Sequence, residues 1–145
     1  MEIKIFDSFQ PLSTMEKKQT IDFLHTHLDE FRDDKESIRK AIDYAQGESS
    51  VVGGFILLGM EGSEIVGAVV INRTGMDGYI PANILVYIAV NGKYRGKGYG
   101  KQLMEKTIEL AKGSIKLHVE PNNPARFLYE KYGFTNKYLE YRLMR

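Results

Sequence analysis

Hydrophobic and polar positions predict that the chain begins with a short strand and two helices. Residues 2–6 alternate polar and apolar side chains, as a half-exposed strand does. Ser13 and Glu16 form a capping-box pattern, so a helix is expected to start there. A second helix is expected to begin after Asp33 or Asp34 and to end at Gly47. The apolar positions at helical spacing are Ile21, Leu24, Leu28 and Phe31 in the first helix and Ile38, Ile42 and Ala45 in the second.

The middle of the chain has the pattern of extended structure followed by a third helix. Two β-rich runs within residues 54–73 are joined by a short turn at Gly62, which predicts a hairpin. Residues 74–82 are expected to form a loop. Residues 84–90 are apolar at nearly every position, which predicts a central strand buried on both faces. A helix follows the glycines at 96–100, and its apolar positions are Leu103, Met104, Ile108 and Ala111.

The last third of the chain is predicted to add a strand, a helix and a final strand. Residues 114–119 alternate, and so do residues 137–145. Between them, Asn123 and Pro124 are a favourable helix start and Gly133 a favourable end, with Ala125, Leu128 and Tyr132 expected to face the core. The order is therefore β-αα-ββ-β-α-β-α-β, which predicts one mixed α/β domain over residues 1–145.

Composition narrows the class of protein. A chain of 145 residues can build one hydrophobic core, and the absence of cysteine excludes disulfides, thiol nucleophiles and cysteine-ligated metals. No apolar run reaches membrane-spanning length, and the N-terminus has no signal-like apolar region, so we expect a cytoplasmic protein without a membrane partner. The net charge of +1 argues against a dedicated nucleic-acid binder.

The charge is unevenly distributed between the two halves of the chain. Residues 1–83 hold 8 Lys/Arg and 14 Asp/Glu, a net −6, whereas residues 84–145 hold 12 and 5, a net +7. This split suggests a polyanionic ligand on the C-terminal half and a cationic one on the N-terminal half. A chance distribution of solvated charges is the alternative.

A glycine-rich segment, "YRGKGYGK" at residues 94–101, is the sharpest candidate for chemistry. It lacks the third glycine of a dinucleotide loop, and it lacks both the first glycine and the Ser/Thr of a Walker loop. The segment does match R-x-x-G-x-G between a strand and a helix. Backbone amides at such a helix start bind anions such as a pyrophosphate, and Lys93, Arg95, Lys97 and Lys101 add positive charge. The alternative is a glycine-rich turn with exposed lysines.

A second motif follows the glycine segment. The pattern N-x-x-A-x-x-x-Y followed by G-F is matched by Asn122, Ala125, Tyr129, Gly133 and Phe134. Together, in this order over residues 82–134, the two motifs resemble those of the GCN5-related N-acetyltransferase (GNAT) superfamily. The resemblance implies a central mixed, mostly antiparallel sheet flanked by helices. It also implies an acetyl-CoA-dependent N-acetyltransferase that acts on a primary amine, from a small molecule or from a peptide or protein, in a ternary complex.

The resemblance also implies where acetyl-CoA, the cosubstrate, would bind. The pyrophosphate would lie on the backbone amides of residues 95–100, and pantetheine would pair with the end of the 84–90 strand. Backbone N–H groups near Ala89 and Val90 would stabilise the oxyanion. The implied cofactor-binding residues are Ile88, Ala89, Val90, Arg95, Gly96, Lys97, Gly98, Tyr99, Gly100, Lys101, Asn122 and Ala125.

The catalytic groups are less clear from the sequence. The resemblance implies that Tyr129 is the general acid for the CoA thiolate, with a core tyrosine as the alternative. Where some relatives carry a glutamate, this chain has His118, which is a candidate base or a solvated strand residue. Glu120 and a water chain remain open as the base, and loss of the base would leave a non-catalytic acyl-CoA-binding module.

Two further features complete the sequence-based expectations. His25 and His27 are two apart on a helix, so they point to different faces and predict no metal site. The acidic residues Asp29, Glu30, Asp33 and Asp34 lie where relatives border the acceptor site, and they suit a cationic amine or a solvated helix junction equally well. A homodimer through the last strand is also compatible with the sequence.

Overall fold

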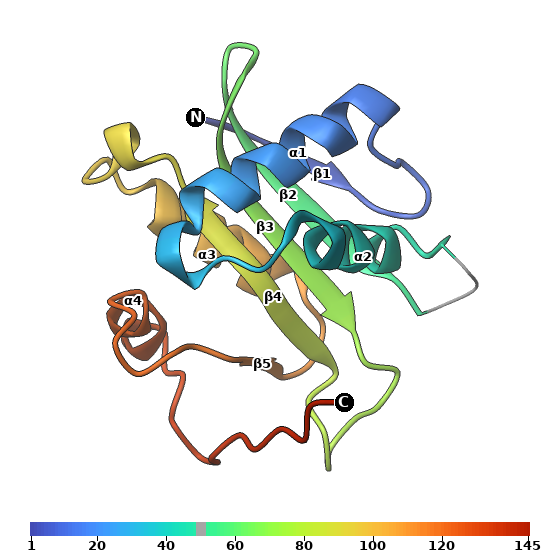
Figure 1. Ribbon diagram of the computed structural model, residues 1–145, viewed down its shortest axis with the longest axis vertical. Coiled ribbons are helices and arrows are strands. Elements are labelled where there is room, and N and C mark those ends of the chain that lie inside the picture. The colour runs from blue at the N-terminus through green and yellow to red at the C-terminus, as the bar shows by residue number, and fades with distance from the viewer. Residues whose placement is uncertain (49–51) are drawn as a thin grey trace.

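The computed structural model describes residues 1–48 and 52–145 and shows a five-stranded sheet with helices on both faces (Figure 1). The strand order is β1-β2-β3-β4-β5, with three antiparallel pairings and one parallel pairing between β4 and β5. The expected mixed, mostly antiparallel sheet and the expected hairpin are confirmed. The strands are β1 (Glu2–Phe6), β2 (Gly54–Glu61), β3 (Glu64–Arg73), β4 (Asn83–Val90) and β5 (Ile115–Leu117).

Helices α1 (Thr14–His27) and α2 (Lys35–Ala45) cover one face of the sheet, and α3 (Tyr99–Leu110) covers the other (Figure 1). The first core includes Leu24, Ile38 and Ile42, all fully buried as their helical spacing predicts. The second core lies under α3 and α4 (Arg126–Lys131) and is built around the completely buried Leu103 and Met104. Each helix therefore uses its apolar face to seal one side of the same sheet.

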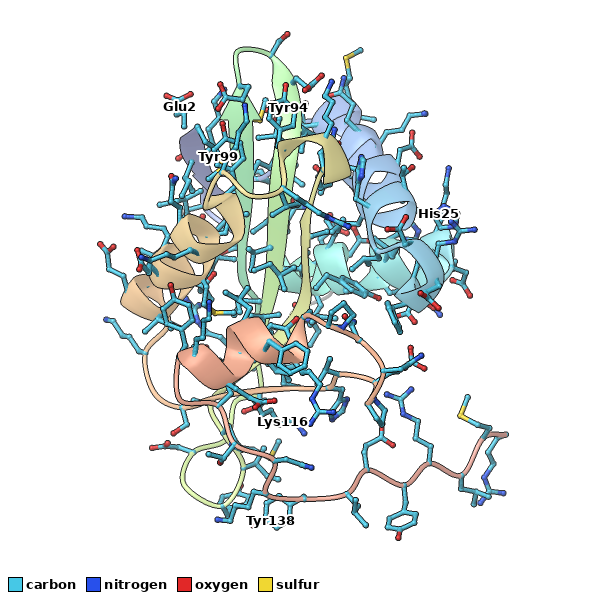
Figure 2. The ribbon with its side chains drawn as sticks, turned by 90° about the vertical axis from the view of Figure 1, so that its left-hand side faces the viewer. Glu2, His25, Tyr94, Tyr99, Lys116 and Tyr138 are labelled. Carbon is cyan, nitrogen blue, oxygen red and sulfur yellow. The ribbon has the colours of Figure 1, made fainter. Side chains whose placement is uncertain are left out.

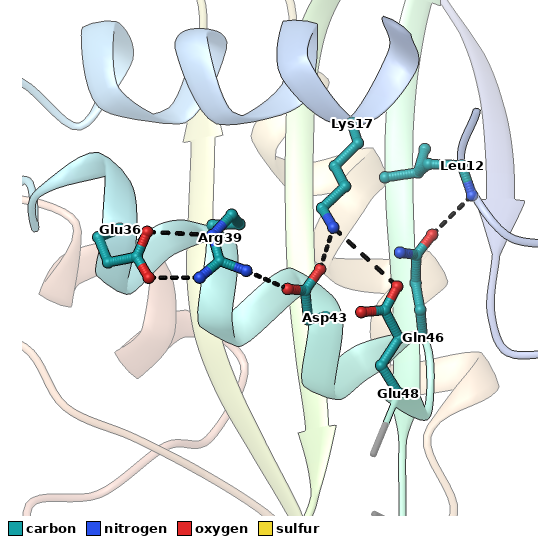
Figure 3. A network of polar contacts seen from close by, with 7 residues as sticks. All are labelled: Leu12, Lys17, Glu36, Arg39, Asp43, Gln46 and Glu48. Atoms are coloured by element: carbon teal, nitrogen blue, oxygen red, sulfur yellow. Dashed lines mark hydrogen bonds and ion pairs between the residues drawn. The ribbon is translucent and has the colours of Figure 1, made fainter. Parts of the chain in front are cut away.

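Polar contacts fix the start of α1 and its position on α2. The Ser13 hydroxyl accepts from the amide of Glu16, and the Glu16 carboxylate accepts from the amide of Ser13, so the predicted capping box is confirmed. Figure 3 shows Asp43 of α2 between Lys17 of α1 and Arg39 of its own helix. The Nη1 group of Arg39 donates to Asp43 Oδ2 over 2.6 Å. These ion pairs are partly exposed, so packing rather than charge supplies most of the stability of the helix pair.

A bulge in β4 changes which way its side chains face. Tyr87 pairs with Val70 and Leu85 pairs with Ile71, so Val86 is an extra residue without a partner in β3. The bulge places Tyr87 and Ala89 in the core under α1 and α2, whereas Leu85 belongs to the core under α3. An extra residue in one strand reverses the alternation beyond it, which is a common way to re-aim side chains beside a functional site.

The strand β4 also differs from the prediction that it is buried on both faces. Its buried residues alternate with half-exposed ones along its whole length. The reason is that β5 pairs with β4 only at residues 83–85, so the rest of that edge is open. The strand expected over residues 114–119 accordingly shortens to β5, because Val119 no longer has a neighbouring strand to pair with.

The C-terminal elements depart furthest from the predicted order. Residues 137–145 form no strand, and residues 135–145 make no backbone–backbone hydrogen bond with the described parts of the chain. A strand is stable only beside another strand, and the free edge of the three-residue β5 is not occupied by this segment. The last helix begins at Arg126, later than expected. It buries Tyr129, while Ala125 and Tyr132, which were expected to face the core, are partly buried against it.

Candidate active site

The glycine segment forms the connection between β4 and α3. A short 3₁₀ helix, η3 (Gly92–Tyr94), follows β4, and α3 starts directly after Gly98. Gly96 and Gly98 have φ angles of 82° and 79°, a left-handed conformation that side chains with a Cβ atom disfavour. Gly98 caps α3 without any side-chain hydrogen bond. The first amides of α3 are therefore available to an anion, and the helix dipole favours negative charge there.

A cleft of ≈ 1160 Å³ opens beside this connection, where β4 and β5 diverge. Beyond Leu85, the β4 edge that faces away from β3 has no strand partner among the residues that the structure describes. Its unpaired peptide groups can therefore form hydrogen bonds with an extended ligand, as they would with an added strand. The cleft is lined by residues 27–33, residues 84–90, Arg95, Gly100, residues 118–121, residues 123–125, Leu128, Tyr129, Glu140 and Arg142.

Tyr129 reaches the cleft from α4 and is only 7% exposed. Its ring packs edge-on against Phe134 with the ring centroids 6.0 Å apart, which helps to hold the side chain in place. Burial raises the pKa of the Tyr129 hydroxyl to about 12, because an ionised phenolate is poorly solvated there. The hydroxyl is protonated at neutral pH, as an ordinary tyrosine is, and can act as a hydrogen-bond donor, while burial makes it a weaker acid.

His118 and Glu120 both line the cleft, at its β5 side. Each lies beyond the end of β5, so their orientation is set by the connection to α4 rather than by strand pairing. The Nδ1 atom of His118 lies 3.8 Å from the Oε1 atom of Glu140 in the C-terminal segment, and the His118 side chain is half exposed. Both residues are exposed and therefore accessible to a ligand in the cleft.

The opposite wall of the cleft is acidic and comes from the connection between α1 and α2. A short 3₁₀ helix, η1 (Asp29–Phe31), starts at Asp29, which has a φ angle of 52°. The Oδ2 atom of Asp29 lies 3.5 Å from the Nη2 atom of Arg95, which joins this wall to the glycine segment. The pair is largely exposed, so it guides side-chain position more than it stabilises the fold.

Tyr87 and Asp33 form a short hydrogen bond in the cleft. The Tyr87 hydroxyl donates to Asp33 Oδ2 over 2.5 Å from its nearly buried position on β4. Burial and then the bond to Asp33 raise the pKa of Tyr87 well above its ordinary value. A hydrogen bond between a buried donor and a charged acceptor is among the stronger ones in proteins, so it holds the acidic wall against the sheet.

Comparison with known proteins identifies the family. Residues 13–134 match the family model described as "Acetyltransferase (GNAT) family". The chain belongs to the GNAT family. No curated protein sequence matches this GNAT chain, but many solved structures share its fold.

The structural relatives align with nearly the whole chain. PH1933 from Pyrococcus horikoshii OT3 has 24% identity and a TM-score of 0.70, with 96% of this chain and 92% of that chain covered. A ribosomal-protein-alanine N-acetyltransferase from Brucella melitensis biovar Abortus 2308 has 17% identity and a TM-score of 0.69, with 100% and 99% covered. An aminoglycoside antibiotic 6'-N-acetyltransferase from Acinetobacter haemolyticus has 14% identity and a TM-score of 0.69, with 100% and 98% covered. At these identities the likeness establishes the fold.

The GNAT cleft brings together most of the residues expected from sequence, but not all of them. The expected residues that line it are Ile88, Ala89, Val90, Arg95, Gly100, His118, Glu120, Ala125 and Tyr129. Gly96, Lys97, Gly98 and Lys101 belong to the glycine segment or the first turn of α3 outside the cleft walls. Asn122 is exposed and does not line the cleft, whereas Asn123 does, and its Oδ1 atom accepts from the amide of Ala125.

Tyr99 points away from the GNAT cleft although it belongs to the glycine segment. Its hydroxyl donates to Glu61 Oε1 over 2.5 Å, and its ring stacks on Tyr94 with centroids 5.9 Å apart. Figure 2 shows both rings together at the end of the molecule that carries the hairpin turn. These contacts tie the segment to the β2–β3 hairpin and hold its backbone in place.

Several cleft residues were not identified as site residues from the sequence. Tyr87, Glu140 and Arg142 all line the cleft. Tyr87 carried one usable signal, a hydroxyl in an otherwise apolar strand, whereas nothing local distinguishes Glu140 or Arg142. His27 also lines the cleft and His25 does not, which agrees with their different helical faces. Burial lowers the pKa of His27, and the nearby Asp29 carboxylate opposes this effect.

Among residues 1–48 and 52–145, no group of three or more His, Cys, Asp or Glu side chains is placed to hold a metal ion. None of the helices in the described part of the chain is long and apolar enough to cross a membrane.

Proposed function

We propose that this GNAT protein is an acetyl-CoA-dependent N-acetyltransferase that transfers the acetyl group directly to a primary amine in a ternary complex. The observation that carries the proposal is that two features adjoin. The first is the amide cradle, by which we mean the first backbone N–H groups of α3, and the second is the open edge of β4 that leads to it. An anion on the cradle and an extended amide chain along the edge together match the pyrophosphate and pantetheine of CoA.

The basic residues of the segment suit the cosubstrate. Lys97 and Lys101 are exposed beside the cradle, and Arg95 lines the cleft. CoA brings several phosphate charges, which long-range attraction to these side chains would help to capture. The pantetheine would end near Ala89 and Val90, where peptide N–H groups would stabilise the oxyanion that forms when the amine attacks the thioester.

The chain would supply a base for the amine and a hydrogen-bond donor for the leaving thiolate. The amine acceptor is protonated at neutral pH and must lose a proton before it attacks, so a base is needed. His118 or Glu120, directly or through water, fits this role because both line the same cleft that the amine would enter. Tyr129 would donate a hydrogen bond to the departing CoA sulfur, since it lines the cleft and its hydroxyl is protonated at neutral pH.

The acceptor would approach between the acidic wall and β4. Asp29 and Asp33 attract a cation, and Tyr87 holds Asp33 in place. The relatives named above include one that acts on a ribosomal protein and one that acts on an aminoglycoside, so protein amines and small amines both belong in a test panel.

The test is release of CoA thiol from acetyl-CoA, measured with small amines, lysine peptides and peptides with free N-termini. We expect release that depends on at least one acceptor and that yields the acetylated amine by mass spectrometry. Thermal denaturation in the presence of CoA tests binding separately from catalysis. CoA at 100 times its dissociation constant should raise the free energy of unfolding by about 2.7 kcal/mol. A thermal shift without turnover on any acceptor would favour a non-catalytic acyl-CoA-binding module, and no shift at all would contradict both functions.

A further inference from the structure

The β2–β3 hairpin carries two carboxylates that face each other at its turn. Glu61 ends β2, Glu64 begins β3, and the two residues are paired directly in the register of the hairpin. Like charges at directly opposite positions destabilise a pair of strands. Partners from elsewhere in the molecule are therefore needed to offset this repulsion.

Those partners come from the glycine segment and the residue before it. The Tyr99 hydroxyl donates to Glu61 Oε1 over 2.5 Å, and the Tyr94 hydroxyl donates to Glu64 Oε1 over 2.8 Å. The Nζ atom of Lys93 lies 3.4 Å from Glu64 Oε2. The hydrogen bond from Tyr99 lowers the pKa of Glu61, and the one from Tyr94 lowers the pKa of Glu64, because each stabilises the charged carboxylate.

The two tyrosines lie on either side of the glycines that lead into the amide cradle. Around Gly96 and Gly98, a Cβ atom would meet no other atom of the described chain within 4 Å, and Gly98 caps α3 without a side-chain hydrogen bond. Glycine also loses more conformational entropy on ordering than any other residue. The stacked rings of Tyr94 and Tyr99 and their bonds to the hairpin therefore supply the constraint that the glycines lack.

We propose that Glu61 and Glu64 are positioning residues for CoA, which hold the amide cradle in its binding conformation through Tyr99 and Tyr94. None of these four residues is among those that line the cleft, so the hairpin would set the affinity for CoA from outside it. A cradle that is ordered in advance loses less conformational entropy when a ligand binds. This inference rests on the proposed binding of CoA, but not on which acceptor or base completes the reaction.

Charge alone and positioning predict opposite effects of removing one of these carboxylates. CoA is a polyanion, so the loss of a nearby negative charge should by itself strengthen CoA binding or leave it unchanged. If the carboxylate holds the cradle, its loss should weaken CoA binding instead. The sign of the change therefore separates the two explanations.

The first test is calorimetric titration of the full chain with CoA. Glu64→Ala is expected to raise the dissociation constant about two- to tenfold, the effect of losing one hydrogen bond. Glu2→Ala is the matched control, because Glu2 is an exposed carboxylate of β1 at the same end of the molecule (Figure 2), and it should not weaken binding. Unchanged or tighter binding by Glu64→Ala, or an equal loss in Glu2→Ala, would overturn the proposal.

The second test removes the hydroxyls and keeps the stacked rings and the charges. The double variant Tyr94→Phe/Tyr99→Phe is expected to raise the dissociation constant of CoA at least about fourfold, and a smaller rise would contradict the proposal. Tyr44→Phe is the control, since the Tyr44 hydroxyl donates to the backbone carbonyl of Arg73 over 2.7 Å, and it should leave CoA binding unchanged.

A double-mutant cycle tests whether Glu64 acts through Tyr94. Adding Glu64→Ala to Tyr94→Phe should weaken CoA binding little further, because the bond between the two side chains is already lost. Fully additive losses would contradict positioning through Tyr94. Failure of the wild-type chain to bind CoA would overturn this inference together with the proposed function, whereas equal CoA binding by the wild type and these variants would overturn this inference alone.

Discussion

Replacement of Tyr129 by phenylalanine removes the hydroxyl while keeping the ring that packs on Phe134. The side chain is 7% exposed, and burial raises the pKa of its hydroxyl to about 12. The substitution leaves the core filled, so the folded structure should persist. It therefore isolates the contribution of one O–H group to the proposed reaction.

The expected loss follows from the two acidities. A free thiol has a pKa of about 8.5, so full proton transfer from a hydroxyl with a pKa of about 12 would be uphill by roughly 5 kcal/mol. Tyr129 should consequently stabilise the leaving thiolate as a hydrogen-bond donor. A hydrogen bond to a charged group contributes about 1.5–3 kcal/mol, which corresponds to a fall in kcat of about 10- to 150-fold.

The assay is steady-state thiol release with wild-type protein and Tyr129→Phe, together with CoA affinity by calorimetry. We expect kcat to fall within that range while the dissociation constant of CoA stays within about twofold of wild type. An unchanged kcat would remove Tyr129 from the chemistry. An equal loss in kcat and in CoA affinity would assign it to binding instead.

The same variant makes a second, independent prediction about pH. A tyrosine whose folded-state pKa exceeds its unfolded value contributes stability that is complete below about pH 10 and is lost as the pH rises toward about 12. The difference between 10.0 and about 12 corresponds to about 2.7 kcal/mol. Urea unfolding over this window should therefore show a smaller alkaline loss for Tyr129→Phe, and identical losses would contradict the burial of the hydroxyl.

Three other predictions test the cradle, the acidic wall and the base. Gly98→Ala should lower the free energy of unfolding by about 1–2 kcal/mol because the φ angle of Gly98 is 79°, and it should also weaken CoA binding. Gly62→Ala is the control: Gly62 has a φ angle of 59° in the hairpin turn, so the variant should lose similar stability and keep its CoA affinity. Tyr87→Phe should lower the free energy of unfolding in urea by about 1.5–3 kcal/mol because the bond to Asp33 is lost, and a loss below 0.5 kcal/mol would show that this contact is weak in solution. If His118 is the base, His118→Gln should lower kcat/KM about 10²- to 10⁴-fold and change the pH–rate profile; an unaltered profile would leave Glu120 or water in that role.

Local patterns were sufficient for much of the fold because they involve residues close in sequence. The capping box at Ser13 and the hairpin turn at Gly62 follow from neighbouring residues, and both are present as expected. The apolar stripe of α2 is buried as its spacing predicts. The glycine segment likewise connects β4 to α3, since the conformations of Gly96 and Gly98 are local requirements.

Features that depend on strand pairing could not be predicted from local patterns. The periodicity of residues 84–90 indicates a buried strand but not the extra residue at Val86, because a bulge is defined by the register with β3. The alternation of residues 137–145 has the pattern of a strand, yet the segment has no partner within the described chain and does not form one. Periodicity describes one strand, whereas pairing requires two.

The sequence by itself determined the family motifs, the order of elements through α4 and the backbone that can receive an anion at the start of α3. Only the tertiary structure decided that β4 and β5 diverge beyond Leu85, which opens the cleft. It alone brought Asp33 to Tyr87 across 54 positions of sequence and buried Tyr129 beside the cleft. The physical reason is that anion-binding turns are formed by consecutive peptide groups, whereas acidities, open edges and opposing charges arise from contacts between segments that are distant in the chain.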